Sequence, residues 1–405
     1  MLTRANQEIG KELRIKVKRD YIGLYLTPFL ADMRMGSIMI AVPLLAISLG
    51  VSSLTLGTLG FTSGLAYISL CFLFGKLSEK WDRKNLMMLG SSLWIAACLL
   101  LGFSSRIYQL YLSMLLLGTG GAMFWPTLEG WIAERESKRS LVKRMSLFSI
   151  SWSAGLTAGP LAGGILFGIN SKLPFYLALL ISTFIFFLLW KTPKLNPSTK
   201  SEAFSQKTFF SNAAGDGSSL YIKISRIANF AVSLSVGVIR YIFPRLGTQL
   251  EISPSVLGLL MFTLSLSQTL TFYGLGRVHQ WRYRALPLIL FQLVTLVGLV
   301  VIFTAHSLPL FFVAFVFIGV GRGMTNFSSL FYSVNITSQR GPSAAIHETV
   351  LGTGFLLGPL IGGAVAQRFS LKAPYLAAAA VVAVGILIQI LTKRYYLSLN
   401  KVTTR

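Results

Sequence analysis

The chain is poor in charged residues and above all in acids. Only 13 of its 405 residues are Asp or Glu, and charged residues of both signs make up 12%, whereas a soluble domain carries about 25%. Hydrophobic residues make up 53% of the chain, and the mean hydropathy is +0.66. The composition therefore argues against a soluble protein and indicates an integral membrane protein.

Residues that carry covalent or metal chemistry are also scarce. The two cysteines, Cys71 and Cys98, lie in apolar runs and do not form a disulfide framework. The three histidines do not cluster with cysteines and acids at zinc spacing. No P-loop pattern for ATP hydrolysis occurs, since the glycine-rich segments lie within membrane helices. We therefore expect no enzyme activity, no metal and no cofactor.

Long apolar segments are what the chain has in abundance. A helix of about 20 residues spans the hydrocarbon core of a bilayer, and backbone groups in lipid must be satisfied within the segment. The basic first 19 residues precede a run long enough to stay in the bilayer, so no cleavable signal is expected. The twelve predicted spans are about 21–49, 54–75, 86–104, 107–132, 145–169, 174–191, 219–244, 254–276, 285–305, 308–336, 344–367 and 373–392.

An internal repeat divides the chain into two related halves. Gly155-x-x-x-Gly159-Pro160-Leu161-x-Gly163-Gly164 recurs as Gly354-x-x-x-Gly358-Pro359-Leu360-x-Gly362-Gly363. Two homologous membrane halves are the usual build of a secondary transporter. The predicted fold is an all-α membrane protein with twelve transmembrane helices in two pseudo-symmetric six-helix bundles. The predicted parts are a basic tail (1–19), an N-terminal bundle (20–191), a linker (192–218), a C-terminal bundle (219–392) and a second tail (393–405).

Lys and Arg gather in alternate loops and at both ends of the chain. The opposite loops carry only Arg106, Lys172, Arg245, Arg368 and Lys372. Because basic loops stay in the cytoplasm, we expect both termini, the linker and the two tails on the cytoplasmic side of the cell membrane. The net charge of +24 is then mostly a topology signal, helped by anionic membrane lipids. Without a soluble domain to carry a basic surface, no nucleic-acid partner is expected.

The loop after the second span resembles the signature loop of the major facilitator superfamily, Gly-x-Leu-Ala/Ser-Asp-Arg/Lys-x-Gly-Arg-Arg/Lys. The matching residues are Gly75, Leu77, Ser78, Lys80, Arg83 and Lys84. Glu79 stands where the family usually has Asp, and Asp82 stands where it usually has Gly. The resemblance implies that Gly75, Glu79, Asp82, Arg83 and Lys84 belong to a cytoplasmic gate closed by ion pairs. The alternative is a solvated basic loop that only follows the orientation rule.

The glycine–proline repeat resembles the fifth-helix motif of the same superfamily, which is often associated with antiporters. Its presence in both halves is equally explained by close helix packing and by proline bends. The residues expected to serve packing and bending are Gly155, Gly159, Pro160, Gly163, Gly354, Gly358, Pro359 and Gly362.

Asp32 lies near the middle of the first predicted helix, which the resemblance places along the central cavity. A charge at bilayer depth costs about 2.5–3.5 kcal/mol, so it usually faces a polar cavity and has a partner. Asp32 is therefore expected to titrate with the proton or to recognise a cation; the alternative is a structural ion pair. Arg34 does not share its helix face, so the two are expected to contact different partners.

Other polar groups are predicted for the same cavity. Arg322 lies near the centre of the tenth helix and either neutralises Asp32 or binds an anionic group of the substrate. Arg240, in the outer part of the seventh helix, belongs to the cavity or an outer gate, or else extends to the outer surface. Asn326 and Trp125 are expected to line the cavity, although periodicity does not separate cavity-lining from lipid-facing residues.

Three residues near the cytoplasmic ends of their helices are assigned to the inner gate. They are Glu129 in the fourth helix and His347 and Glu348 in the eleventh. A carboxylate near the start of a helix also offsets the helix dipole, and a buried histidine is as well suited to a structural hydrogen bond as to proton relay.

These residues predict a monomeric secondary transporter of a small organic solute, working by alternating access and coupled to protons. The glycine–proline motif and the aromatic content favour efflux by antiport. The alternatives are proton-coupled import of a metabolite, a lipid flippase, and a membrane receptor of the same fold without transport.

Overall fold

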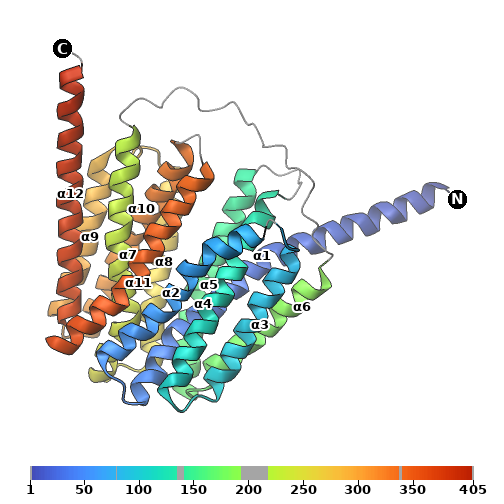
Figure 1. The fold of residues 1–405 in the computed structure, drawn as a ribbon, viewed down its shortest axis with the longest axis horizontal. Coiled ribbons are helices and arrows are strands. Elements are labelled where there is room, and N and C mark those ends of the chain that lie inside the picture. The colour runs from blue at the N-terminus through green and yellow to red at the C-terminus, as the bar shows by residue number, and fades with distance from the viewer. Residues whose placement is uncertain (1, 79, 135–140, 193–217, 337–339, 404–405) are drawn as a thin grey trace.

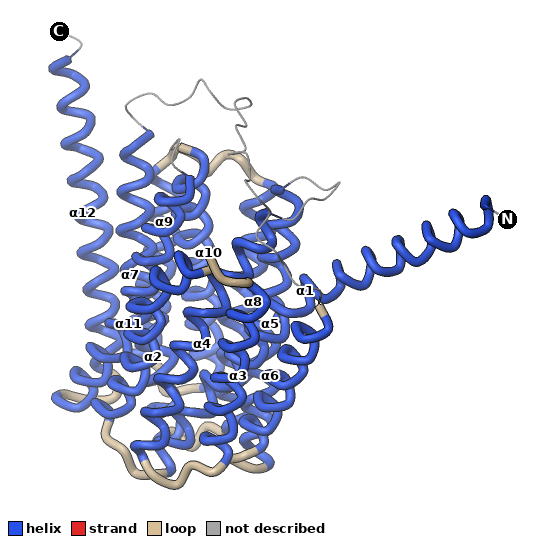
Figure 2. The backbone as a smooth tube through the Cα atoms, turned by 45° about the vertical axis from the view of Figure 1, so that its right-hand side comes forward, coloured by secondary structure: helices blue, strands red, loops and turns tan. Residues whose placement is uncertain are grey.

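The structure is a computed structural model that describes residues 2–78, 80–134, 141–192, 218–336 and 340–403. Within these ranges every regular element is an α-helix, as Figure 2 shows. The helices are α1 (Leu2–Ser48), α2 (Ser53–Leu77), α3 (Arg83–Gly102), α4 (Ile107–Glu134), α5 (Leu141–Ile169), α6 (Leu173–Lys191), α7 (Ser218–Gln249), α8 (Pro254–Arg277), α9 (Ala285–Thr304), α10 (Leu308–Asn335), α11 (Arg340–Arg368) and α12 (Ala373–Thr403).

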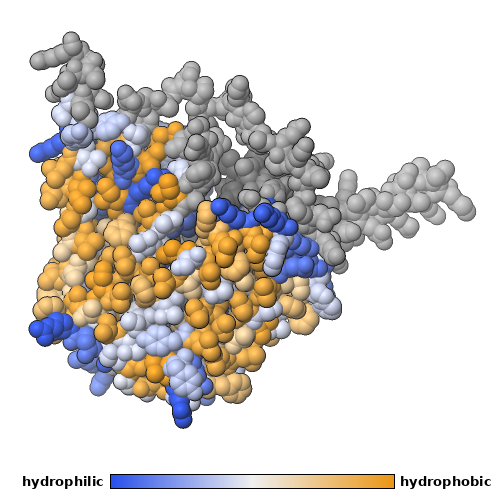
Figure 3. Space-filling view, in the orientation of Figure 1, coloured by the Kyte–Doolittle hydropathy of each residue, from blue (hydrophilic) through white to orange (hydrophobic). Residues whose placement is uncertain are grey.

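In the described part of the chain, twelve helices are long and apolar enough to cross a membrane, which confirms the predicted all-α, twelve-span fold. Figure 3 shows hydrophobic residues over the middle of the molecule and hydrophilic residues toward its ends. Large apolar side chains such as Phe72 and Leu180 are exposed, as expected where a protein meets lipid instead of water.

Three helices extend by five residues or more beyond one end of their predicted spans. The first begins at Leu2 and the last runs to Thr403, so the described parts of both predicted tails are helical. Neither extension contains a proline to stop it. α7 continues past Pro244 to Gln249. Most of the predicted linker, 193–217, lies outside the described residues.

The two ends of the helix bundle are distinguished by their loops. The short-loop side carries the connections 49–52, 103–106, 170–172, 250–253, 305–307 and 369–372. The linker side is the opposite end, where α6 ends at Lys191 and α7 begins at Ser218. Figure 1 shows α7–α12 beside α1–α6, with α2 and α11 adjacent between them.

The halves repeat individual hydrogen bonds on the short-loop side. Lys172 donates from Nζ to the Ser104 carbonyl oxygen at 2.7 Å, and Lys372 donates to the Ala305 carbonyl oxygen at 2.8 Å. Each lysine thereby binds a carbonyl just beyond the C-terminus of a helix, where carbonyls lack intrahelical partners and cations are favoured. Burial lowers the pKa of Lys172 from its ordinary value.

The repeated glycines bring helices within each half into close contact. A Cβ added to Gly159 of α5 would lie 2.9 Å from the Gly36 Cα of α1. A Cβ added to Gly358 of α11 would lie 3.1 Å from the Gly237 Cα of α7. The absence of side chains thus permits the same backbone approach in both halves.

Other glycines of the motif join the two halves to each other. A Cβ on Gly164 of α5 would lie 2.8 Å from the Gly258 Cα of α8, and one on Gly363 of α11 would lie 2.6 Å from the Ser53 carbonyl oxygen of α2. Arg245 also donates a hydrogen bond from α7 to the Val51 carbonyl oxygen. These contacts hold the halves together on the short-loop side.

Candidate functional site

Four charged side chains lie in the middle portions of their helices. Asp32 and Arg34 belong to α1, Arg240 to α7 and Arg322 to α10. Asp32 is 7% exposed, while Arg34 and Arg322 are each 3% exposed. Within the described part of the chain none of the four takes part in an ion pair. The centre of the protein therefore holds charges that lack direct counterions.

Arg34 is directed into the N-terminal half. Its guanidinium stacks over the Trp94 ring of α3 at 3.9 Å from the ring centre and lies beside the Cys98 thiol. Its Nε and Nη1 have no hydrogen-bond partner. Asp32 and Arg34 thus contact different surroundings, as residues two positions apart on a helix do.

Asp32 makes no hydrogen bond within the described chain. The charges that act on it are those of Arg34, in the same helix, and Arg240, in the other half. A carboxylate between two cations but bonded to neither remains free to take up a proton or a ligand group.

Arg322 does not neutralise Asp32. Its Nη1 donates to Asn229 Oδ1 at 2.9 Å and to Ser233 Oγ at 2.8 Å, both on α7 of its own half. Ser233 is the repeat counterpart of Asp32. The C-terminal half therefore holds the cation beside a neutral side chain, and the N-terminal half holds the acid.

Arg240 and Arg322 both contact one aromatic ring. Their guanidinium carbons lie 4.4 Å and 5.0 Å from the ring centre of Phe355 in α11. Such distances are typical of cation–π contacts. The two like charges are close enough to act on each other, so Phe355 brings them together at one place.

Asn326 and Trp125 lie on α10 and α4, at equivalent positions of the two halves. Asn326 is one helical turn from Arg322, is 8% exposed and makes no hydrogen bond with the described residues. In the N-terminal half, Gly121 takes the place of Arg322, and the rings of Tyr67 and Trp125 lie against it. Where the C-terminal half has a buried arginine, the N-terminal half thus has a glycine beside two aromatic rings.

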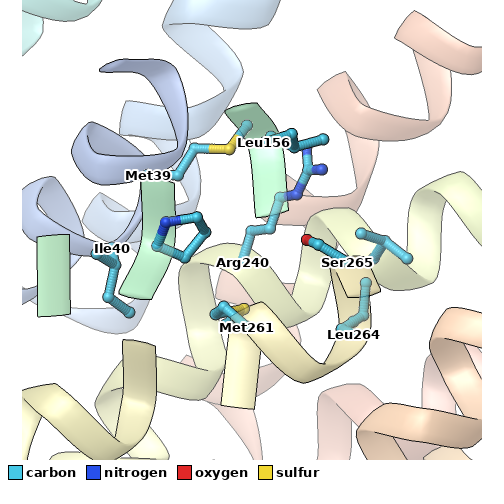
Figure 4. Close-up of a pocket in the computed structure, with 9 residues that line it drawn as sticks. Met39, Ile40, Leu156, Arg240, Met261, Leu264 and Ser265 are labelled. Atoms are coloured by element: carbon cyan, nitrogen blue, oxygen red, sulfur yellow. The ribbon is translucent and has the colours of Figure 1, made fainter. Parts of the chain in front are cut away.

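A small pocket lies where the halves meet at this level. Met39, Ile40, Leu156 and Pro160 line it from the N-terminal half, and Val236, Arg240, Met261, Leu264 and Ser265 line it from the other. Figure 4 shows Arg240 among these residues with its guanidinium beside Leu156. The cavity volume of about 20 Å³ is room for about one water molecule, so a solute requires the pocket to widen.

The predicted inner-gate residues lie nearer the linker side. Glu129 and Glu348 come from different halves, are both exposed, and repel each other. His347 is buried and its Nδ1 shares a hydrogen bond of 2.8 Å with Ser329 Oγ, while Nε2 is 3.7 Å from Glu348 Oε1. The histidine therefore ties α11 to α10, and the acids face the space between the halves.

The signature loop makes its described contacts within the N-terminal half. Asp82 caps α3 by accepting a hydrogen bond of 2.9 Å from the Lys84 backbone amide. Lys84 Nζ donates to the carbonyl oxygens of Trp190 and Thr192, at 2.8 Å and 2.7 Å, at the C-terminal end of α6. Buried Arg83 packs against Gly130, and Gly75 lies close to Pro126. Glu79 lies outside the described residues.

Four residues of the central site were not among the predictions: Tyr67, Asn229, Ser233 and Phe355. Asn229 and Ser233 are polar residues four positions apart in an apolar span, a spacing that would have placed them on one helix face. Phe355 and Tyr67 carry no such signal, because aromatic residues in membrane helices face lipid as readily as a cavity.

Comparisons with known proteins agree with the fold. The sequence profile of the Major Facilitator Superfamily matches residues 24–221 and 227–401. Multidrug resistance protein 1 of Bacillus subtilis (strain 168) is 22% identical over 372 residues, which cover 90% of this chain and 94% of that protein. Tetracycline resistance protein, class B, of Escherichia coli is 34% identical over 135 residues, covering 32% of this chain and 33% of that protein.

Solved structures superpose over almost the whole chain. A bacterial homologue of the human lysosomal transporter Spinster, in an inward-facing and occupied conformation, has a TM-score of 0.73 and 14% identity and covers 94% of this chain and 98% of its own. The nucleoside transporter NupG has a TM-score of 0.69 and 15% identity, covering 92% of this chain and 99% of its own. At these identities the similarity shows the fold alone.

Proposed function

Because the chain belongs to the Major Facilitator Superfamily and is a membrane transporter, we propose that it moves a small organic solute by secondary active transport coupled to protons. Asp32 is the proposed proton site. Arg34 and Arg240 set the charge around it, and Arg240, Arg322, Phe355 and Asn326 belong to the solute site. Protons and the solute are the proposed partners, in a monomer in the cell membrane with both termini in the cytoplasm.

The observation that carries the proton coupling is the state of Asp32. It is the one acid in the middle portion of the described membrane helices, it is buried, and no described side chain is bonded to it. Intramembrane carboxylates of this kind mark ion and proton pathways. Its interaction with Arg240 crosses from one half to the other, so its charge state affects how the halves attract each other.

Alternating access fits the contacts between the halves. The close contacts of Gly164 with α8 and of Gly363 with α2 close the short-loop side, while Glu129 and Glu348 are exposed near the linker side. Rocking of two repeats about a site between them is the usual transport movement of such folds. We propose that Glu129, His347, Glu348 and the signature loop close the linker side in the other state.

Two directions of coupling are candidates. Export in exchange for protons is favoured by the drug-resistance names of several relatives, including Multidrug resistance protein 1 and the quinolone resistance protein NorA of Staphylococcus aureus. Co-transport with protons is favoured by the excess of buried arginines over acids at the centre, because loss of the Asp32 charge would strengthen the binding of an anionic solute. The direction of the flux under an imposed pH gradient separates the two.

The test is the Asp32→Asn variant in proteoliposomes with an imposed pH gradient. Tetracycline and a quinolone serve as first probes, and a pH-sensitive dye records proton movement that depends on the solute. We expect at least a tenfold loss of gradient-driven flux, with exchange of labelled for unlabelled solute retained. Glu251→Gln, at an exposed acid on the short-loop side, is the control. Undiminished proton-driven flux in Asp32→Asn would refute the assignment.

A further inference from the structure

The charges at the centre of the protein do not balance. Buried Arg34 and Arg322 and half-buried Arg240 share this region with a single carboxylate, Asp32, and none of the four forms an ion pair with a described residue. The exposed Glu348, nearer the linker side, also acts on Arg322. Uncompensated charge is costly at bilayer depth, and an unpaired buried ion is more costly than a paired one. A ligand that brings negative charge would supply the missing counterion.

Two of these cations are positioned to act on one ligand group. Arg240 and Arg322 contact the same Phe355 ring. Arg322 still has a free Nε, and Arg240 makes no hydrogen bond within the described chain. Guanidinium groups bind carboxylates through paired N–H donors, so both side chains have donors available for an acidic group.

Neutral donors stand beside the two arginines. Asn229 Nδ2 is fully buried and has no hydrogen-bond partner, although its Oδ1 accepts from Arg322. Asn326 lies one turn from Arg322 and is also without a partner among the described residues. Buried amide donors are nearly always satisfied in folded proteins. The unsatisfied amide of Asn229 therefore marks a place that is complete only with a ligand or water.

The rest of the surroundings is apolar. Met39 and Leu156 from one half and Met261 and Leu264 from the other line the pocket that Arg240 enters (Figure 4). Methionine side chains adapt to ligands of different shape and contact aromatic rings favourably. The pocket therefore suits a hydrophobic body attached to the acidic group.

We propose that the transported solute is an amphipathic organic anion, with a carboxylate on an aromatic or other apolar body. The carboxylate binds between Arg240 and Arg322, and the body contacts the apolar wall between the halves. This assignment rests on the proposed transport function and adds the charge class of its substrate.

The acids near the linker side do not reverse this preference. Glu348 acts on Arg322 but forms no ion pair with it, and its side chain is 57% exposed. Glu129 is also exposed, so water and salt screen part of the charge of both acids. Arg322 is almost fully buried, where the attraction between opposite charges is much stronger. A solute that has reached the centre is therefore selected by the arginines.

The charge of Asp32 opposes the binding of such a solute. The carboxylate acts on Arg34 and Arg240, so its neutralisation leaves more positive charge for the ligand. Proton and anion would then bind more strongly together than separately, which is the coupling of co-transport. The Asp32→Asn variant separates this proposal from cation recognition, since loss of the acid would weaken the binding of a cation.

The experiment compares matched ligands of different charge on the full chain in lipid nanodiscs. Three sets of ligands are used, built on a one-ring, a two-ring and a three-ring aromatic body. Within a set, the same body carries an acetate, an acetamide or an ethylammonium group. Calorimetry measures the binding of each to wild type and to Arg240→Gln, Arg322→Gln, Asp32→Asn and the control Arg277→Gln, at an exposed surface arginine. Thermal unfolding and size exclusion verify that each variant is folded.

We expect at least one acetate to bind about tenfold or more tightly than its acetamide. Arg240→Gln and Arg322→Gln should each weaken that acetate about tenfold or more, as loss of a charge-assisted hydrogen bond does, without changing acetamide binding. Arg322→Lys restores part of the affinity, which a misfolded protein would not show. Asp32→Asn should bind the acetate at least as tightly as wild type, and Arg277→Gln should match wild type.

The proposal is overturned if no acetate binds more tightly than its acetamide, or if the ethylammonium compounds bind best. Gradient-driven flux of an ammonium compound would then keep the transport function and reject only the anionic substrate. Conversely, selective acetate binding without any flux would keep the site and reject the transport function.

Discussion

The two halves of the protein use the same backbone contacts and different charges. Gly159 packs on α1 as Gly358 packs on α7, and Lys172 binds a carbonyl oxygen as Lys372 does. At the centre the equivalence ends: the C-terminal half has Ser233 where the N-terminal half has Asp32. It also has Arg322 where the other half has Gly121, and Arg240 where the other half has Met39.

The difference reflects how tightly each position is constrained. Where helix backbones touch, almost any side chain would collide with a neighbouring main chain, so both halves keep glycine. Where a side chain faces a space between the halves, many sizes and charges fit, and the halves have diverged. The repeat therefore marks the framework, and its exceptions mark the site that we propose for proton and solute.

The largest effect is expected from a variant that gives the C-terminal half an acid at the position equivalent to Asp32. Ser233→Asp places a carboxylate next to Arg322 Nη1, which now lies 2.8 Å from the serine hydroxyl. The new ion pair should occupy the arginine and lower the affinity for the anionic solute about a hundredfold, which corresponds to about 2.7 kcal/mol. Calorimetric titration of the best-binding acetate measures the loss.

Ser233→Asn is the matched control, since it changes size in a similar way without adding charge. It should weaken the acetate by much less than Ser233→Asp. Equal affinities for the two variants would mean that the charge of Arg322 does not select the solute.

A matched pair of glycine substitutions tests the helix packing that the two halves share. Gly159→Ala and Gly358→Ala each force a methyl group against a facing helix, at 2.9 Å and 3.1 Å from the nearest glycine Cα. We expect both to lower the free energy of unfolding by about 1–3 kcal/mol, as overpacking does. Thermal unfolding of the purified protein in one detergent measures the two losses side by side.

Gly274→Ala is the control, because a Cβ there meets no atom within 4 Å. It should be neutral or slightly stabilising, since alanine favours the helix. A loss of stability in only one of the two variants, Gly159→Ala or Gly358→Ala, would show that the halves do not share the same packing constraint.

A smaller difference between the halves lies in α9 and α12. Gln292 and Gln389 exchange two hydrogen bonds, from Gln292 Nε2 at 3.0 Å and from Gln389 Nε2 at 2.9 Å, whereas α3 has Ser91 in place of Gln292. Each single change to Leu should destabilise the protein by about 0.6 kcal/mol, the average for hydrogen bonds between membrane helices.

The double variant Gln292→Leu with Gln389→Leu should recover part of the loss, because no buried amide is then left without a partner. Thermal unfolding of the two single variants and the double variant gives the coupling between the residues. Strictly additive losses would show that the amides do not depend on each other.

Much of the architecture could be predicted from local features. Twelve apolar runs predict twelve spans because lipid offers the backbone no hydrogen bonds, and the structure confirms them. The helical ends were less predictable: the first and last helices extend into the predicted tails, since helix formation continues until a residue interrupts it. Because a charged side chain is costly in a membrane, the sequence predicts that Asp32 lies near other charged groups. Which groups these are could not be predicted.

The contacts in the central site show most clearly what could not be predicted from the sequence. Of the two predicted roles of Arg322, binding of a substrate anion stays a prediction. Direct neutralisation of Asp32 is wrong, because the arginine bonds to Asn229 and Ser233. Its partners lie about ninety positions away in the chain, on a helix whose rotation is set by packing against α10 and α11. Phe355 is even farther from Arg240 in the sequence, and only the crossing of three helices brings both arginines to its ring.

The sequence by itself determined that the chain is a duplicated, twelve-span membrane protein, because hydropathy and repeated glycines are local properties that survive in any arrangement of the helices. Only the tertiary structure decided which charges meet. It placed Asp32 between Arg34 and Arg240, set Arg322 against the neutral counterpart of Asp32, and left more positive than negative charge at the centre. The physical reason is that electrostatic interaction depends on distances between helices, and those distances are decided by the packing of whole helices against one another.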